Sequence, residues 1–167
     1  MRTHLFAALL LLFAATASAQ TKVVGTWKLL SATQTNADGK TVLEFGANPK
    51  GFLTYTADGH MHALITEDAR PPLSVNDRAA APEAERARAF ATGFAYAGTY
   101  TVSGGKVTHK VLISTIPNWV GQNFVRRFEL KGDKLIIVTE GAMVLRGVKV
   151  DHIELVWLRD TSTPATQ

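Results

Sequence analysis

The chain contains no cysteine among its 167 residues. It therefore cannot form disulfides or thiolate metal sites, and its stability must come from a packed core and a closed hydrogen-bond network. A thiol nucleophile is excluded for the same reason. The absence predicts a fold that closes on itself through noncovalent packing.

Motifs that mark a catalytic nucleophile or a metalloprotease are also missing. The sequence contains neither G-x-S-x-G nor H-E-x-x-H, the patterns that place a reactive serine or a zinc ion. Glycine pairs such as Gly104-Gly105 stand in turn sequences and not in phosphate-binding loops. No cofactor is expected, and a non-catalytic role is favoured over an enzymatic one.

Charge and hydropathy exclude two further classes of protein. The formal net charge is +4, and the basic residues are scattered, with only Arg86/Arg88 and Arg126/Arg127 close together. A nucleic-acid surface would show a denser basic stripe, so no nucleic-acid partner is expected. Beyond the first 19 residues, no apolar run is long enough for a transmembrane helix.

The N-terminal segment has the organisation of a secretory signal peptide. Arg2 precedes an apolar run over 5–15, and Ala17-Ser18-Ala19 forms a small-x-small cleavage site. The run is too short to span a bilayer core of about 30 Å. We therefore expect a signal peptide over 1–19, cleavage after Ala19 and a periplasmic or secreted protein, with a retained anchor as the alternative.

The remaining chain alternates between strand patterns and turn residues. Asp58-Gly59 is a hairpin turn sequence, since glycine supplies the positive backbone angle that such turns need. We see no linker that would divide the chain, so one domain is expected over 20–160, followed by a disordered tail over 161–167. The predicted strands are 24–31, 41–45, 52–56, 60–65, 97–102, 107–114, 124–130, 135–139 and 148–159.

One helix interrupts the strands, predicted over 79–94. This segment is rich in alanine, and Pro82 suits a first helical turn. An apolar stripe at three- and four-residue spacing should pack on the body of the fold; its members are Ala87, Phe90, Ala91 and Phe94.

About eight or nine strands joined mainly by short hairpins predict an all-β fold. Antiparallel meanders of this size avoid open edges by closing into an up-and-down barrel, whose interior can hold one small ligand. A sandwich is the competing arrangement. The nearly continuous hairpin connections favour the barrel.

An ordered set of short motifs now supports a family resemblance. Gly25-Thr26-Trp27 resembles the G-x-W signature of lipocalins, and the region from about Val24 to Arg159 is similar to the lipocalin-like domain family of bacteria and fungi. The matching pieces are 48–56 with Asp58-Gly59, 96–100, 107–109, 117–121, Arg126 with 128–130, and 132–135.

The resemblance implies a calycin-type barrel and no particular activity. It also implies that Trp27 closes the base of the barrel and that Arg159 lies across its ring, as a cation–π contact. These two residues are expected to serve the structure.

Two polar residues fall at positions where strand alternation requires an inward side chain. Arg126 shares a face with Phe124 and Phe128, and His109 shares one with Val107. A buried arginine needs a carboxylate, carbonyl groups or an anionic ligand. An internal ion pair with Glu154 or Asp151 is one alternative for Arg126, and contact with a ligand is the other. For His109 the alternatives are a satisfied core histidine and a polar group or acid/base in a cavity.

Aromatic residues with polar tips could line the same interior. Trp119 is the strongest candidate, because it lies in the loop 116–121 and not in a strand. The predicted ligand-binding set is Arg126, His109, Trp119, Tyr55, Tyr96 and Tyr100. His60 and His62 share a strand face, but no third ligand is placed, so no metal site is predicted.

The leading hypothesis is an exported barrel that binds a small hydrophobic or amphipathic molecule. The polar end of the ligand, an anionic group in one version, would meet Arg126 and His109, while Trp119 and the helix cover an opening. One alternative is an isomerase, cyclase or hydrolase that uses His109 as acid/base. Another is a non-catalytic module of the cell envelope that acts through an exposed apolar patch.

Overall fold

The fold is an antiparallel β-barrel, seen in a computed structural model that describes residues 22–145 and 147–162. The predicted signal peptide 1–19 lies outside the described residues, as do residues 163–167 of the predicted tail.

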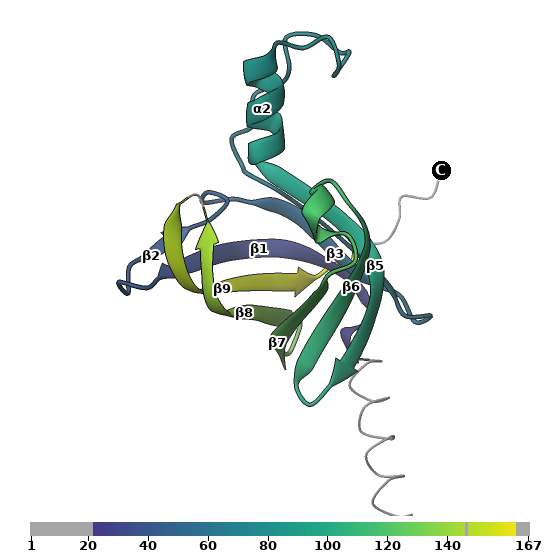
Figure 1. Cartoon of the computed structure of the whole chain (residues 1–167). Helices are drawn as coiled ribbons and strands as arrows, with labels where there is room; N and C mark the ends of the chain where they lie inside the picture. The colour runs from purple at the N-terminus through teal and green to yellow at the C-terminus, as the bar shows by residue number, and fades with distance from the viewer. Residues whose placement is uncertain (1–21, 146, 163–167) are drawn as a thin grey trace, which may run out of the picture.

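Nine strands form one sheet in the order β2-β1-β3-β4-β5-β6-β7-β8-β9, and β1 also pairs with β9 (Figure 1). Eight strands therefore close into a ring, and β2 extends the sheet beside the second half of β1. All pairings are antiparallel, which confirms the barrel and excludes the sandwich. The strands are β1 (Gly25–Asn36), β2 (Thr41–Leu43), β3 (Lys50–Tyr55), β4 (His60–Thr66), β5 (Gly93–Ser103), β6 (Lys106–Ser114), β7 (Asn123–Lys131), β8 (Lys134–Leu145) and β9 (Val148–Arg159).

Strands β1 and β8 run well past their predicted C-terminal ends, residues 31 and 139, and each contains a bulge. The pairing of β1 with β9 shifts between Leu29 and Ser31, and β1 then continues to Asn36. The pairing of β8 with β9 shifts between Glu140 and Met143, where Gly141 adopts a φ of 109°. A bulge adds an unpaired residue without ending the ladder, which alternation alone does not reveal.

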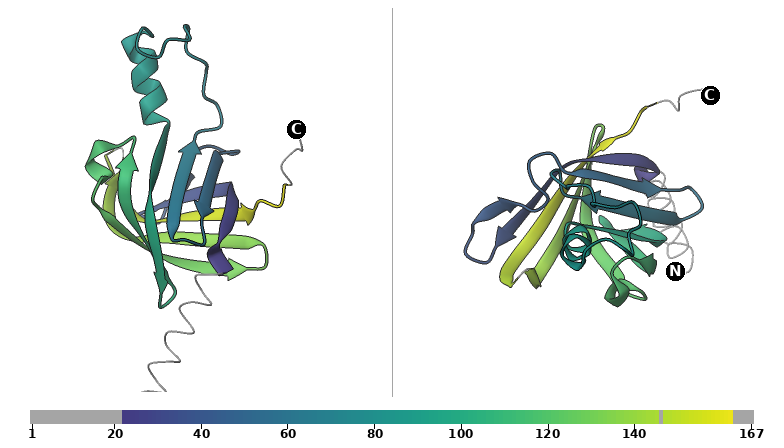
Figure 2. Two further views of the ribbon diagram at one scale, coloured as in Figure 1. Left: turned by 90° about the vertical axis from the view of Figure 1, so that its right-hand side faces the viewer. Right: turned by 90° about the horizontal axis from the view of Figure 1, so that it is seen from above.

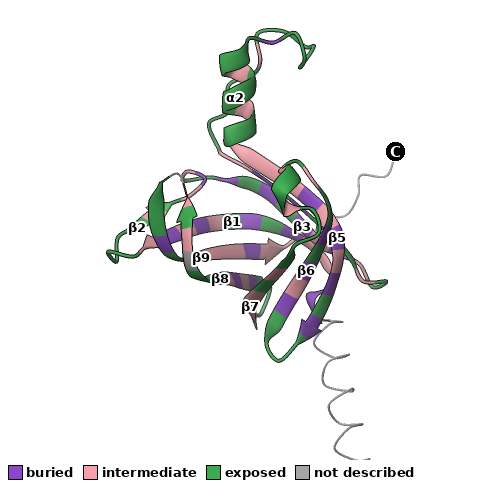
Figure 3. Cartoon of the chain, in the orientation of Figure 1, coloured by how far each residue is buried: buried purple, intermediate pink, exposed green. Residues whose placement is uncertain are grey.

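Residues alternate between the interior and the outer surface along most strands (Figure 3). In β3, Leu53 and Tyr55 are buried while Phe52 between them is exposed. Most buried side chains join one core inside the ring, drawn from strands on every side of it. Burial of this apolar surface is the main stabilising contribution in a protein without disulfides.

One end of the barrel is sealed by a contact between its first and last strands. Trp27 is fully buried, and its Nε1–H donates to the carbonyl oxygen of Val23 at 2.8 Å. The Arg159 guanidinium carbon lies 4.0 Å from the centre of the indole ring. Arg159 also donates to the carbonyl oxygens of Val24 and Lys22, at 2.9 and 2.8 Å. The structure thus bears out the contact that the family resemblance implies.

The helix differs from its prediction in extent and in packing. Helix α2 covers Glu83–Ala91, contains no buried residue and stands beyond the end of β5, away from the barrel wall (Figures 1 and 2). Phe90 is 56% exposed, whereas Phe94 belongs to β5 and packs against the core. The predicted stripe is therefore wrong, because without Phe94 it holds mainly small alanine side chains that bury little apolar area. In the part of the chain described, no helix is long and apolar enough to cross a membrane.

Candidate functional site

A network of polar side chains crosses the barrel interior, centred on His109 of β6. The imidazole is 1% exposed. Its Nε2 lies 2.6 Å from the Tyr55 hydroxyl, and its Nδ1 lies 2.9 Å from the Tyr96 hydroxyl and 3.1 Å from Nη1 of Arg126. These side chains come from β3, β5, β6 and β7, and each points inward because of strand alternation. Tyr55, Tyr96 and Arg126, three of the predicted site residues, therefore surround His109, which is the fourth.

Arg126 is held without a carboxylate. Its Nε donates to Thr139 Oγ1 at 3.0 Å, Nη1 reaches the Tyr96 hydroxyl at 3.4 Å, and the guanidinium carbon lies 4.8 Å from the centre of the Phe124 ring. Within the described residues, no Asp or Glu forms an ion pair with this half-buried cation. Its charge therefore has no protein counter-ion in this part of the chain.

Of the two alternatives for Arg126, the internal ion pair with Glu154 or Asp151 is wrong. Both acids line a hollow together with Arg127 and Glu140, two side chains that are more than half exposed. Arg127 neighbours Arg126 in a strand, so the two side chains lie on opposite faces of the barrel wall. The acids consequently face the solvent side, away from the Arg126 guanidinium.

The hydrogen bonds assign the proton on His109. An arginine N–H can only donate, so Nδ1 must accept from Arg126, and the ring proton lies on Nε2 and is donated to Tyr55. Burial, followed by the nearby Arg126 charge, holds the pKa of His109 well below its usual value. His109 is therefore neutral near pH 7.

The two tyrosines remain protonated in this environment. Burial is the main cause that raises the pKa of Tyr55 well above its usual value, and the neighbouring Tyr96 adds to it. Burial also raises the pKa of Tyr96, although Arg126 opposes the change. Both hydroxyls therefore keep their protons as hydrogen-bond donors across the physiological pH range.

A small cavity of about 30 Å³ adjoins the network. This volume is large enough for a water or two, since one buried water needs about 10–15 Å³ on this scale. Trp157 lines the cavity and is 1% exposed, and its Nε1–H has no hydrogen-bond partner among the described residues. The full lining is Leu53, Ala63, Ile65, Phe94, Tyr96, His109, Arg126, Ile137, Leu155 and Trp157.

Trp119 lies over the network as part of an aromatic cluster, defined as Phe94, Tyr96, Trp119 and Phe124. Its ring centre is 4.9 Å from that of Phe94, 5.4 Å from Phe124 and 5.9 Å from Tyr96, in edge-on contacts. Trp119 ends the short 3₁₀ turn η1 (Pro117–Trp119) in the loop between β6 and β7. The expectation that it covers the interior agrees with this packing, whereas helix α2 stands apart from it.

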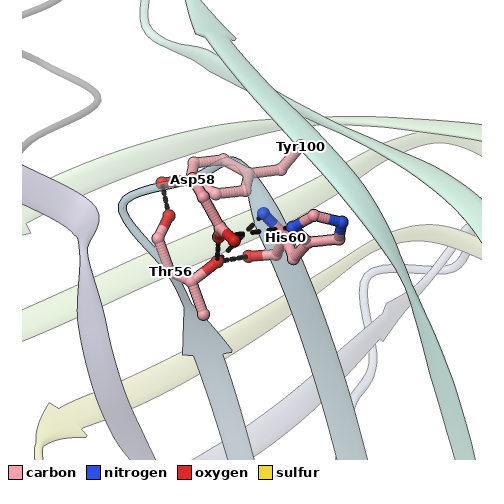
Figure 4. Close-up of polar contacts among 4 residues, drawn as sticks. All are labelled: Thr56, Asp58, His60 and Tyr100. Carbon is pink, nitrogen blue, oxygen red and sulfur yellow. Dashed lines mark hydrogen bonds and ion pairs between the residues drawn. The ribbon is translucent and has the colours of Figure 1, made fainter.

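Tyr100 lies beside the network and forms a hydrogen bond to the backbone. Its hydroxyl donates to the backbone oxygen of Thr56 at 3.0 Å, beside the hairpin where Asp58 contacts Thr56 and His60 (Figure 4). Its ring lies 4.5 Å from that of Tyr55, centre to centre. Tyr100 therefore supports the wall behind Tyr55 and directs its polar tip toward the hairpin.

The paired histidines of β4 show no ligand arrangement. His60 lies 3.3 Å from the Asp58 carboxylate at the surface, and His62 is exposed. Among the residues described, no group of three or more His, Asp or Glu side chains could hold a metal ion.

Sequence reasoning missed three residues at the site. Thr139 receives a hydrogen bond from Arg126, Trp157 contributes a donor without a partner, and Phe94 joins the aromatic cluster. Alternation along β9 could have identified Trp157, but that strand carries apolar residues on both faces. Phe94 falls in the predicted helix, whereas Thr139 ends the predicted strand 135–139 on the same face as Leu135 and Ile137, so alternation could have placed it inward.

A closed eight-stranded antiparallel barrel with a polar network inside it is a calycin-type architecture. The chain belongs to the lipocalin-like domain family, whose model matches residues 24–159. It is 29% identical over 97 residues to the 4'-hydroxy-3'-methoxypropiophenone carrier protein ppsC of Aspergillus oryzae, a match covering 53% of this chain and 87% of that protein. A crystal structure of a lipocalin-like protein from Bacteroides uniformis aligns with a TM-score of 0.44 at 12% identity, covering 83% of this chain and 98% of that one.

Proposed function

We propose that the chain is a binding protein for a small amphipathic molecule, whose anionic or strongly hydrogen-bond-accepting end meets Arg126 inside the barrel. The observation that carries the proposal is the half-buried Arg126 cation, which lacks a carboxylate partner among the described residues. A charge removed from water is costly unless it is paired. A ligand that carries the opposite charge supplies that pairing.

The unused hydrogen-bond donors of the network restrict the chemical groups that the ligand can present. Tyr55 accepts from His109, and its own hydroxyl proton has no acceptor among the described residues. Nη2 of Arg126 likewise has no partner in this part of the chain. The remaining hydrogen-bonding capacity of the network consists of donors, so it selects a carboxylate, phenolate or carbonyl oxygen over an amine or ammonium group.

The unpartnered Nε1–H of Trp157 supports the same conclusion independently. A buried donor without an acceptor costs about 1–3 kcal/mol. Trp157 lines the cavity that Arg126 also lines. An acceptor placed in this cavity, from a ligand or from water, would remove that cost.

Binding requires the interior to open. The cavity of about 30 Å³ is far smaller than the roughly 300–1,000 Å³ of a typical small-molecule site. The aromatic cluster occupies the space between the network and the β6–β7 loop. We infer that Trp119 and this loop move outward to admit the ligand, which places the indole against the bound molecule.

The distant fungal relative supports a carrier role. Its name describes a carrier of 4'-hydroxy-3'-methoxypropiophenone, a small aromatic ketone with a phenolic hydroxyl group. Such a molecule is amphipathic and offers oxygen acceptors, in keeping with a donor-rich interior. We further propose, from the apolar run 5–15 and the Ala17-Ser18-Ala19 site, that this chain is exported and acts in the periplasm or outside the cell.

An enzymatic role for His109 is the second candidate. The imidazole is within hydrogen-bond reach of three polar side chains and lines the cavity, as an acid/base would require. Both ring nitrogens are already engaged by protein groups, however, and Nδ1 faces a cation. This arrangement favours a structural histidine that positions Tyr55 and Arg126.

Native mass spectrometry of the purified chain tests the proposal directly. We expect a bound small molecule that solvent extraction removes. The extracted protein is then titrated with laurate and with 1-dodecanol, and binding is measured by tryptophan fluorescence. The two probes have the same chain length, so a difference in affinity reports the contribution of the negative charge. Laurate should bind at least about tenfold more tightly, because a charged hydrogen bond contributes about 1.5–3 kcal/mol.

Matched substitutions locate the binding. Arg126→Met should remove the preference for laurate while dodecanol binds as before, and Arg127→Met, its neighbour on the outer face, should change neither. Absence of extractable ligand together with no binding of either probe would overturn the proposal. Equal effects of the two arginine variants would place the anion outside the barrel.

A further inference from the structure

The outer wall of the barrel is divided by charge. Five adjacent strands contain no Asp or Glu at any position, namely β1, β3, β4, β5 and β6. The remaining wall carries all the acids of the strands: Glu129, Glu140, Asp151 and Glu154. About half of the circumference is therefore free of negative charge along the strands.

The acid-free wall also exposes large apolar side chains next to lysines. Phe52 pairs across the strands with Lys28 on one side and Leu64 on the other, and the two apolar side chains are 44% and 48% exposed. We call the following outward residues the basic face: Lys28, Leu30, Lys50, Phe52, His62, Leu64, Lys110 and Ile113.

Small residues join these side chains into a continuous surface. Leu64 pairs with Ala95, and Ala97 pairs with both His62 and Ile113, so no bulky polar group separates Leu64 from Ile113. Ile113 is 66% exposed. Partly or fully exposed residues alternate with buried ones along β5 from Ala95 and along β6 as far as Val111, so the face follows the strand pleat (Figure 3).

We propose that the basic face docks on an anionic lipid bilayer. Lysines at the border attract the negative head groups, and the apolar side chains between them enter the interfacial region, the combination that binds proteins to membrane surfaces. An exposed apolar patch with a charged border marks an interaction surface in a soluble fold. The absence of acids from five strands fits a negatively charged partner.

Carboxylates in the segments that border this face are Asp58, Glu67, Asp68 and Asp160; Glu67 and Asp68 directly follow β4, and Asp68 accepts a hydrogen bond from the Asn48 N–H at 3.0 Å. Asp58 contacts His60 in the hairpin between β3 and β4. Asp160 follows the end of β9, and the nearby Lys28 is one cause that lowers its pKa, after its hydrogen bonds to Ser162. None of these acids lies within the row formed by Phe52 and Leu64, so the apolar centre carries no negative charge of its own.

Vesicle co-sedimentation tests the docking. The chain is mixed with vesicles of phosphatidylcholine alone or with 30% phosphatidylglycerol, at low salt and at 0.5 M NaCl. We expect binding to the anionic vesicles only, and a loss of binding at high salt because ions screen the attraction. Lys50→Glu/Lys110→Glu should weaken partitioning by at least about tenfold, since each lysine near an anionic surface contributes about fivefold.

A control with the same change in net charge makes the test specific. Lys40→Glu/Lys149→Glu reverses two exposed lysines, one in the turn before β2 and one in β9, outside the basic face, and should retain most of the binding. The apolar segment 5–15 is present in both variants, so its own membrane affinity cancels in the comparison. Equal loss in both variants, or equal binding to neutral vesicles, would overturn the proposal. A dimer in analytical ultracentrifugation that Leu64→Glu dissociates would also overturn it, by assigning the face to a second copy of the chain.

Discussion

The Tyr55 hydroxyl lies 2.6 Å from Nε2 of His109, and this contact joins β3 to β6 across the barrel interior. Tyr55→Phe removes the acceptor for the buried Nε2–H and leaves a polar group without a partner. We expect a loss of about 1–3 kcal/mol in the free energy of unfolding, measured by urea denaturation.

Tyr100→Phe provides the comparison for this substitution. Its hydroxyl donates to the backbone oxygen of Thr56, which also accepts a hydrogen bond from the Gly59 backbone. The Thr56 oxygen keeps this second hydrogen bond in the variant. The loss in the free energy of unfolding should therefore be near the low end of about 0.5–1.5 kcal/mol. A Tyr55→Phe variant as stable as the native chain would contradict the network.

The protonation state of His109 should appear as a pH dependence of stability. Its pKa is held well below the usual value by burial and by Arg126, so the unfolded chain binds a proton there more readily than the folded chain does. Stability should therefore fall as pH drops below about 6.5 and rise with pH through that value. At pH 5.5 the loss in the free energy of unfolding that His109 causes reaches about 1.4 kcal/mol.

His109→Gln isolates this contribution from the other titrating groups. The difference in unfolding free energy between pH 8.0 and 5.5 should be smaller in the variant, because the remaining histidines are unchanged. Urea denaturation at the two pH values measures it. The same pH dependence in both proteins would show that the folded chain can protonate His109.

Arg159 should contribute to stability well beyond an ordinary surface arginine. Arg159→Met removes the contact with the Trp27 ring and two hydrogen bonds to backbone oxygens. The expected loss is about 2–3 kcal/mol. Arg127→Met breaks only an exposed ion pair with Glu140 and should cost less than about 1 kcal/mol. Comparable losses in thermal unfolding would contradict the role assigned to Arg159.

Two nearby phenylalanines should behave very differently. Phe90 of helix α2 is 56% exposed, so Phe90→Ser should change stability by less than about 0.5 kcal/mol. Phe94 contacts Phe45, Tyr96 and Trp119, and Phe94→Ala should cost about 2–4 kcal/mol. A large effect of Phe90→Ser would instead indicate that the helix packs on the barrel.

Gly98 should tolerate no side chain. A Cβ at this position would overlap the carbonyl oxygen of Lys110, a backbone atom of the paired strand at the bulge between β5 and β6. Gly98→Ala should cost more than about 3 kcal/mol or prevent folding, since overlap with backbone cannot be relieved by a rotamer change. Gly104→Ala, in an open hairpin with φ of 57°, should cost about 1–2 kcal/mol. Similar soluble yields and melting temperatures for both variants would contradict this account.

The sequence predicted the barrel and the centre of the site because both depend on regular alternation. The pattern around Val107–His109 and Phe124–Arg126 has a clean period of two, so their inward orientation followed directly. The partner of Arg126 could not be predicted, because a bulge near the start of β9, between Val150 and His152, breaks the parity count that would have placed Asp151. The predicted extent of the helix was wrong for another reason. A turn at Asp77–Pro82 delays its start, and β5 begins early enough to include Phe94.

The pairing of β1 with β9 joins parts of the chain that are far apart, since Arg159 reaches the backbone of Val24 across 135 positions of sequence. The ring can close only after the last strand has been made, and until then β1 and β8 both present unpaired edges. Closing so long a loop makes folding slow, and open edges invite association with other chains. The nascent protein must therefore remain unaggregated through nearly its whole synthesis, and a truncation within β9 would be expected to abolish folding and not merely to shorten the barrel.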